Sequence, residues 1–315
     1  MGGDRGPDEI VAGAAAAASD AVQPIVVGRS GLDTQGLEFL HAPDVITMED
    51  KPTEAIRAKP ASSLVVACKA VAEGKADAVV SPGNTGAMLA ACLRELRRLP
   101  EVRRPAIAVT IPAKRGPSVL IDAGANADAR PEDLVQSAHM GTVFAQEILG
   151  VRNPEVRLLS IGEEAEKGNQ LTLEAHALLA ASELDFRGNT EGRDLLARAA
   201  DVVVTDGFTG NVALKTLEGT IRTVLEGLRT ELTASASGRL GGLLIRRGAR
   251  KLRRRLDPET YGGAYLLGLR GLAVIAHGNS SQVAIANAIR LAARGVEHDV
   301  TGRLESRIPR ETAAV

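Results

Sequence analysis

The sequence predicts an α/β fold built on a mostly parallel sheet. Short runs rich in valine and isoleucine alternate with stretches whose apolar residues recur at helical spacing. Four of the predicted strands lead into polar, glycine-containing turns, and ligands of parallel sheets bind at the carboxyl ends of strands. We therefore expect a single α/β domain over residues 1–315, with all four turns on one edge of the sheet.

The elements follow in order along the chain. Proline and acidic residues open a predicted helix at residue 7, and Ser62 or Ser63 is available to cap another. Pro131 and two acidic residues begin a third, and apolar spacing continues a fourth beyond Asn211. The predicted helices are 7–20, 61–73, 131–149, 170–182, the segment after 211, and 281–294; the predicted strands are 24–28, 77–81, 105–112, 118–122, 158–161, 201–205 and one run before residue 277.

The turn at 206–211, DGFTGN, raises the question of what it binds. Its glycines, Gly207 and Gly210, allow close approach of a ligand, and the start of the following helix favours an anion. Similar turns follow three other predicted strands. Lys167 lies in one of these turns, and Lys215 lies just after the turn at 206–211. This pattern favours a phosphate-sized anion, although each turn alone is equally well an ordinary strand-to-helix connection.

Composition excludes several classes of protein. Apolar residues make up 44% of the chain, aromatic residues only 2%, and the formal net charge is −1. The core is therefore expected to be aliphatic, without stacking platforms for nucleic acid. Neither metal-binding motifs nor a membrane-spanning run is found in the sequence, and Cys68 and Cys92 indicate buried thiols of a reducing compartment. The expected location is the cytoplasm.

Residues 239–256, RLGGLLIRRGARKLRRRL, differ from the rest of the chain. They carry eight basic residues and no acidic one, with leucines at helical spacing and three glycines. We expect a basic amphipathic helix within a protrusion over 233–257. Such a helix suits an anionic membrane surface or an acidic protein partner; nucleic acid is disfavoured. The candidate contact residues are Leu240, Leu243, Leu244, Ile245, Arg246, Arg247 and Arg253.

Eight motifs together carry a resemblance to a known family. In chain order they are MGGDRGP, SPGNTGAML, IDAGAN, SIGEEAEKGN, FRGNTEGRDL, DVVVTDGFTGNVALKTLEG, YGGAYLLGL and AHGNSS. The chain resembles, over nearly its whole length, the PlsX family of phosphate acyltransferases. The family's apolar strand before MGGD has no counterpart in this sequence, so we expect either that the sheet lacks one strand or that the start of the sequence is misplaced.

The resemblance implies a three-layer α/β/α, Rossmann-like domain related to phosphotransacetylases and the isopropylmalate dehydrogenase group. It implies a homodimer that makes acyl phosphate from acyl-acyl-carrier-protein and inorganic phosphate, without metal or other cofactor. A membrane glycerol-3-phosphate acyltransferase then uses the product, and the helical protrusion touches the membrane peripherally. The family's catalytic lysine and asparagine fall on Lys167 and Asn211.

The chemistry assigns candidate roles to the other motif residues. Attack of phosphate on a thioester needs a held phosphate and a stabilised oxyanion. Lys167 suits either task; Asn211 suits the oxyanion, or is only a helix cap. His277 is a candidate acid or base, or a structural histidine. The candidate substrate and phosphate-binding residues are Gly83, Asn84, Thr85, Gly86, Asp122, Asn126, Gly207, Thr209, Gly210 and His277, with Asp122 and Asn126 suited to orienting their loop.

Two other functions fit the same sequence features. A short-chain phosphotransacetylase would use acyl-CoA with the same loops. A non-catalytic, membrane-associated scaffold on this fold would need neither Lys167 nor the glycine turns.

Overall fold

An eight-stranded sheet forms the centre of the computed structural model, which describes residues 2–114, 116–197 and 200–309. A separate parallel pair, β1 (Ile25–Gly28) and β2 (Glu38–His41), lies beside it. The main sheet has the strand order β3 (Ala78–Ser81), β10 (Leu272–Ile275), β9 (Ala264–Leu267), β4 (Ala106–Ile111), β5 (Ser118–Ile121), β8 (Val202–Val204), β6 (Val156–Ser160) and β7 (Phe186–Glu191).

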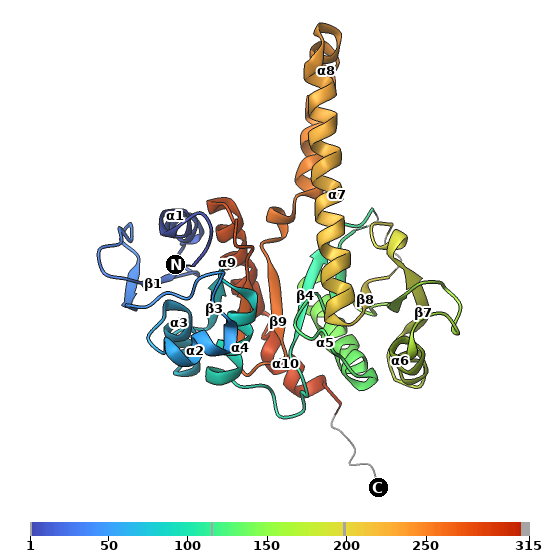
Figure 1. Ribbon diagram of the computed structural model, residues 1–315, viewed down its shortest axis with the longest axis horizontal. Helices are drawn as coiled ribbons and strands as arrows, with labels where there is room; N and C mark the ends of the chain where they lie inside the picture. Colours follow the sequence, from blue (N-terminus) through green and yellow to red (C-terminus); the bar gives the residue numbers. More distant parts are fainter. Residues whose placement is uncertain (1, 115, 198–199, 310–315) are drawn as a thin grey trace.

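Helices cover both faces of this sheet, which confirms the three-layer prediction (Figure 1). Alternate strand residues divide between two cores: Val119 and Ile121 face one, and Leu120 faces the other. The first face carries α1 (Pro7–Ala17), α5 (Pro131–Leu149), α6 (Gln170–Ala180), α9 (Gln282–Glu297) and α10 (Val300–Arg307); the second carries α2 (Pro52–Ala58), α3 (Ser63–Ala72), α4 (Thr85–Glu95) and the start of α7 (Gly207–Ala234).

Strand direction divides the sheet into two parts. Strands β5, β8, β6 and β7 are mutually parallel, and β3 is parallel to β10. Between these groups, β4 and β9 form three antiparallel pairings, β10–β9, β9–β4 and β4–β5. An odd number of reversals makes β3 and β10 run opposite to β5, β8 and β6. The sheet is mostly parallel, as predicted, but its two groups of strands finish at opposite ends.

We name these ends by the residues that follow the strands. The Lys167 end carries the loops after β5, β6 and β8, namely 122–130, 161–169 and 205–206. The His277 end carries the loops after β3 and β10, namely 82–84 and 276–281. The prediction that all four glycine turns share one edge is therefore wrong: the turn after β3 lies at the end opposite to the other three.

A helical hairpin projects from the body (Figure 1). Helix α7 continues into α8 (Ala236–Leu256) through Ser235, whose hydroxyl caps α8 by accepting from the Gly238 N–H at 2.9 Å. No residue of α8 is buried. Among the described residues, no helix is sufficiently long and apolar to pass through a bilayer.

The glycines of α8 have a structural use. A Cβ on Gly242 would sit 3.7 Å from Leu232 Cβ, and one on Gly238 would sit 3.0 Å from Leu232 O, so these positions face α7. Helical spacing places Ile245 and Leu252 on that same side, and they are 49% and 40% exposed. Three further leucines, Leu240, Leu243 and Leu244, lie on the side away from α7 by the same spacing and are more exposed, at 62%, 62% and 79%.

The helix at 131–149 and the strands around Val79, Leu120 and Val203 are confirmed. The run before residue 277 contains two antiparallel strands rather than one. Short elements β2, α2, β7 and α10 were not predicted, and two 3₁₀ turns, Gly192–Asp194 and Pro258–Tyr261, complete the structure.

Candidate active site

Asp122 organises the loop that follows β5. The residue is 2% exposed. Oδ1 accepts backbone N–H groups from Ile107, Gly124 and Ala125 at 2.9–3.0 Å. Oδ2 accepts from the Asn126 backbone at 2.8 Å and from Asn126 Nδ2 at 2.9 Å. Five hydrogen bonds saturate a buried carboxylate, so Asp122 shapes the loop and has no lone pairs left for a substrate group.

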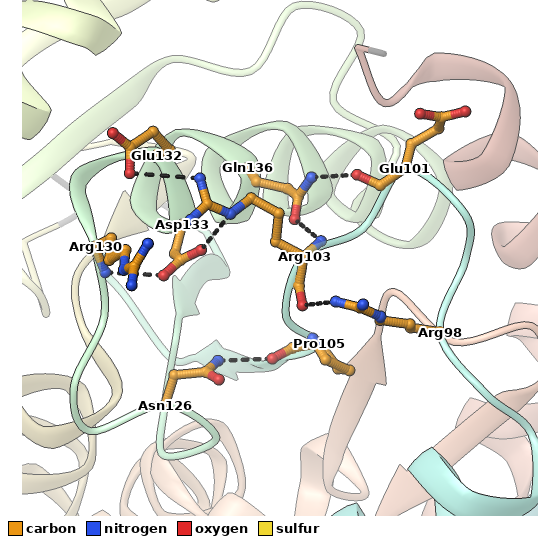
Figure 2. A network of polar contacts seen from close by, with 9 residues as sticks. All are labelled: Arg98, Glu101, Arg103, Pro105, Asn126, Arg130, Glu132, Asp133 and Gln136. Carbon is orange, nitrogen blue, oxygen red and sulfur yellow. Dashed lines mark hydrogen bonds and ion pairs between the residues drawn. The ribbon is translucent and has the colours of Figure 1, made fainter. Parts of the chain in front are cut away.

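Asn126 also stabilises the loop that follows β5. Besides its bonds to Asp122, Nδ2 donates to Pro105 O at 2.7 Å, and its own carbonyl accepts from Gly207 N–H at 2.8 Å. Figure 2 shows Asn126 directed at Pro105. The predicted orienting role of Asp122 and Asn126 therefore has a geometric basis, whereas direct phosphate contact by their side chains has none.

A polar network holds the segment before Pro105 against α5 (Figure 2). Arg103 lies 3.5 Å from Glu132 and 3.4 Å from Asp133, at the start of that helix. Gln136 accepts from the Arg103 N–H at 2.7 Å and donates to Glu101 O at 2.7 Å. Through Pro105 and Asn126, this network fixes the position of the Asp122 loop.

Helix α7 begins against that loop. Asp206 caps it by accepting from Thr209 N–H at 2.9 Å. A Cβ on Gly210 would sit 1.9 Å from Asp122 O, and one on Gly207 would sit 2.7 Å from Asn126 N, so both positions require glycine for packing. The N–H groups of Gly207, Thr209 and Gly210 are hydrogen-bonded within the chain. These three residues therefore offer a ligand no free backbone donor, only the exposed Thr209 hydroxyl.

Asn211 has a different environment. Asp206, not Asn211, is the cap of α7, so the alternative role of Asn211 as a helix cap is wrong. Its side chain is exposed beside Gly124, whose Cβ would lie 3.6 Å from Asn211 Cβ. Within the described residues no hydrogen bond occupies its amide group. Asn211 thus presents a free donor at the Lys167 end of the sheet.

Lys167 lies in the loop after β6, the strand next to β8. Its backbone N–H donates to Glu164 O at 3.1 Å, and its carbonyl accepts from Ser160 Oγ at 2.8 Å. The side chain is exposed, and no ion pair with it is formed in the part of the chain that the structure describes. Lys167 and Asn211 therefore come from the ends of adjacent strands, each with its polar group unengaged.

The glycine turn at the His277 end is built differently. Asn84 caps α4 by accepting from Ala87 N–H at 3.1 Å, while its Nδ2 donates to Met48 O and Asp50 O at 3.1 and 3.2 Å. Gly83 N–H donates to Ser81 Oγ at 3.2 Å. A Cβ on Gly86 would meet Pro52 at 2.7 Å. Of the four residues 83–86, only Thr85 has an exposed side chain with no hydrogen bond among the described residues.

His277 is part of a charged cluster that the sequence alone did not reveal. Its Nε2 lies 3.3 Å from Glu218, whose other oxygen lies 2.9 Å from Lys215 Nζ. Burial raises the pKa of Glu218, but hydrogen bonds and charges from His277 and Lys215 lower it by more than burial raises it. The net shift of the pKa is therefore downward. The sequence feature that could have predicted part of this cluster is the spacing of Asn211, Lys215 and Glu218, which places them on one helix face.

Helix α7 therefore connects the two ends of the sheet. Asn211 lies at the Lys167 end, and Glu218, seven residues or about 10 Å further along the helix, contacts His277 at the other. The structure thus joins Asn211 and His277 through one helix but does not bring their side chains together.

Comparison with solved structures defines the class of fold. The structure resembles a branched-chain phosphotransacylase from Enterococcus faecalis, with a TM-score of 0.60, 19% identity and coverage of 94% of this chain and 98% of that one. A phosphotransacetylase from Streptococcus pyogenes gives a TM-score of 0.58 at 18% identity, covering 91% of both chains. The fold is that of the phosphotransacylases, as the sequence resemblance implied.

Comparison of sequences gives the family. The chain matches the fatty acid synthesis protein family over residues 1–303. It is 46% identical to a phosphate acyltransferase of Thermobifida fusca, covering 100% of this chain and 90% of that protein. It is 43% identical to one of Heliobacterium modesticaldum, covering 98% and 96%. The chain belongs to this family, the PlsX family, and is an acyltransferase.

Proposed function

We propose that this enzyme transfers the acyl group of an acyl-acyl-carrier-protein to inorganic phosphate and releases acyl phosphate and the free carrier. The observation that carries this proposal is the placement of Lys167 and Asn211 at the ends of neighbouring strands, with side-chain donors not used in the fold. The relatives named phosphate acyltransferase support phosphate as the acceptor.

The reaction makes a small number of demands on the site. A phosphate oxygen attacks the thioester carbonyl carbon, and the carbonyl oxygen becomes an oxyanion. The tetrahedral intermediate collapses, the carbon–sulfur bond breaks, and the carrier thiolate leaves and takes a proton from solvent. The Lys167 ammonium attracts the phosphate, and the Asn211 amide donates to the oxyanion. Because the thioester is already activated, no nucleophilic side chain is required.

An assay of donors tests this proposal. The purified protein is incubated with long-chain acyl-carrier-protein or with acetyl-CoA, each with and without inorganic phosphate, and acyl phosphate is trapped with hydroxylamine. We expect product only with phosphate and the carrier thioester. Preference for acetyl-CoA would support a short-chain phosphotransacetylase instead. Loss of thioester independent of phosphate would contradict phosphate as the acceptor.

We further propose that the hairpin binds an anionic membrane with its tip first. The tip at Ser235 is followed within about 15 Å by Leu240, Leu243 and Leu244, which are 62%, 62% and 79% exposed. Helical spacing places basic residues on the same outward face, nearer the body of the protein: Arg247, Arg250, Lys251 and Arg254. Apolar side chains at the tip suit the acyl boundary, and basic ones behind them suit lipid phosphates.

Vesicle binding distinguishes this role from docking of the carrier protein. Replacing Leu240, Leu243 and Leu244 with serine removes the outward leucines but leaves the contact of α8 with α7. We expect loss of co-sedimentation with phosphatidylglycerol vesicles and an unchanged KM for the carrier substrate without vesicles. Ile245→Ser, on the α7 side, is the matched control. A raised KM with retained vesicle binding would assign the segment to the carrier.

We also propose that the protein is a homodimer that delivers acyl phosphate to a membrane glycerol-3-phosphate acyltransferase. Two large apolar side chains next to Asn211, Phe208 and Val212, are 66% and 51% exposed and suit burial against a second copy. Analytical ultracentrifugation of the Phe208→Ser variant tests this: a monomer is expected, and an unchanged dimer would move the interface elsewhere.

A further inference from the structure

The motif FRGNTE forms β7, the outermost strand on the side of the Lys167 loop. Two of its polar residues, Asn189 and Thr190, are only 1% and 2% exposed. A buried amide at the rim of a sheet must satisfy its donors and its acceptor within the protein. Its partners therefore indicate what this strand does.

A register break directs Asn189 toward α6. Val156 of β6 pairs with Phe186 and Leu158 pairs with Asn189, so one intervening residue on β6 faces two on β7. Gly188, with φ of 84°, lies in this bulge. Residues three apart on a regular strand point to opposite faces, and a bulge re-aims the side chain that follows it.

His176 of α6 shows the effect of the bulge. The Phe186 ring packs edge-on against the His176 ring, with centroids 5.1 Å apart. Asn189 Oδ1 lies 2.9 Å from Nδ1 of the same histidine. Both side chains reach one residue of α6 because the bulge adds a residue between them.

The hydrogen bonds then fix the orientation of the Asn189 amide. Its Nδ2 donates to Glu164 O at 2.8 Å, and a carbonyl can only accept. Oδ1 must therefore face His176 and accept from its Nδ1–H. Glu164 O also accepts the backbone N–H of Lys167. One carbonyl thus connects the buried amide to the backbone of the catalytic candidate.

We propose that Asn189 is a positioning residue for Lys167: with His176 behind it, it holds the Glu164 carbonyl and so fixes where the lysine backbone lies. This inference rests on the proposed role of Lys167. Ser160, which donates to Lys167 O from the other side, completes the support of the loop.

Two substitutions test the proposal against a matched control. Asn189→Ala removes both hydrogen bonds, and His176→Phe removes only the donor while keeping the packed ring. Arg187→Ala, on the same strand, changes an exposed arginine whose partner is Asp185. We expect kcat to fall about 10- to 100-fold for Asn189→Ala, the scale of a misplaced catalytic group, and less for His176→Phe. The control should match the wild type.

Trypsin cleavage after Lys167 gives a readout independent of activity. A loosened loop should be cut faster in Asn189→Ala and His176→Phe than in Arg187→Ala, at temperatures where circular dichroism shows all three folded. If Asn189→Ala does not fold, His176→Phe alone decides. Turnover and cleavage equal to those of the control would overturn the inference. Normal turnover of Lys167→Ala would instead remove the proposed role of the lysine, whatever the cleavage rates show.

Discussion

The two ends of the sheet carry similar glycine-rich turns but use them differently. At the His277 end, the amide of Asn84 is consumed by capping α4 and bonding two carbonyls, and His277 is paired with Glu218. At the Lys167 end, the side chains of Asp122 and Asn126 are likewise hydrogen-bonded within the fold, whereas those of Lys167 and Asn211 have no partner among the residues that the structure describes. The two ends therefore differ in which polar side chains have no hydrogen-bond partner within the fold.

This comparison shows why a glycine turn is an ambiguous signal. Gly86, Gly207 and Gly210 are required by close backbone or side-chain contacts with Pro52, Asn126 and Asp122. Their presence would be needed with or without a ligand. We therefore base the proposed site on Lys167 and Asn211, whose side-chain donors form no hydrogen bond or ion pair among the described residues, rather than on the glycines.

The largest effect on stability is expected from Asp122→Ala. The substitution leaves five donors around a buried site, and each unsatisfied donor costs about 1–3 kcal/mol. With partial relaxation and water entry, we expect the free energy of unfolding to fall by at least about 3 kcal/mol. Urea denaturation measures it, with the exposed neighbour Asp128→Ala as the control. A loss below about 1 kcal/mol would show that the loop does not depend on this carboxylate.

The largest effect on activity without loss of stability is expected at Lys167 and Asn211. Removing one donor to a developing oxyanion costs roughly 10²–10³ in kcat. We therefore expect Lys167→Ala and Asn211→Ala each to lower turnover by at least about 10²-fold. Thermal melts should remain close to those of the wild type, since neither side chain supports the fold. Near-normal turnover in a folded variant removes that residue from the mechanism.

Asn84→Ala should give the reverse result. Loss of a helix cap costs about 1 kcal/mol, and two side-chain hydrogen bonds are lost with it. We expect a lower melting temperature and a kcat within a few-fold of the wild type. If turnover falls as far as in Asn211→Ala, while stability is unchanged, the distinction drawn between the two ends of the sheet is incorrect.

The smallest effect concerns Glu218 and depends on pH. Its pKa in the folded protein lies below the ordinary 4.5 because His277 and Lys215 outweigh the opposing effect of burial. A carboxyl with a lowered pKa stabilises the folded state above pH 4.5, and this contribution disappears as pH falls through the folded pKa. The melting-temperature difference between wild type and Glu218→Gln should therefore be present at pH 7 and shrink below pH 4.5. A difference that is constant down to pH 3 would contradict the ion-pair explanation.

Sequence patterns predicted the layers of this fold better than the relative directions of its strands. Helix α5 was predicted with correct bounds because Pro131, acidic residues and a terminal glycine mark both ends. Alternation of strands and helices suggested that all four turns share one edge, yet two antiparallel connections without an intervening helix, β4 to β5 and β9 to β10, change the direction of the strands within the sheet. Relative strand direction depends on long-range pairing, which local periodicity does not record.

The site was predicted in part for the same reason. The motifs predicted Lys167 and Asn211 on two glycine loops at one edge of the sheet, but not that their strands, β6 and β8, are neighbours. The saturation of Asp122 depends on Ile107, which lies on another strand. Glu218 was missed because its partner His277 lies 59 residues further along the chain. Contacts of this kind appear only when the chain is folded.

The glycine contact between α8 and α7 separates two properties of the hairpin that are usually linked. Where two helices pack through large side chains, a change of surface chemistry disturbs their association. Here Gly238 and Gly242 bring the backbone of α8 against Leu232, and the outward residues take no part in that contact. Natural selection can therefore alter the outward face of α8 one residue at a time, adapting it to different partners or lipid compositions, while the joint between the helices is inherited unchanged.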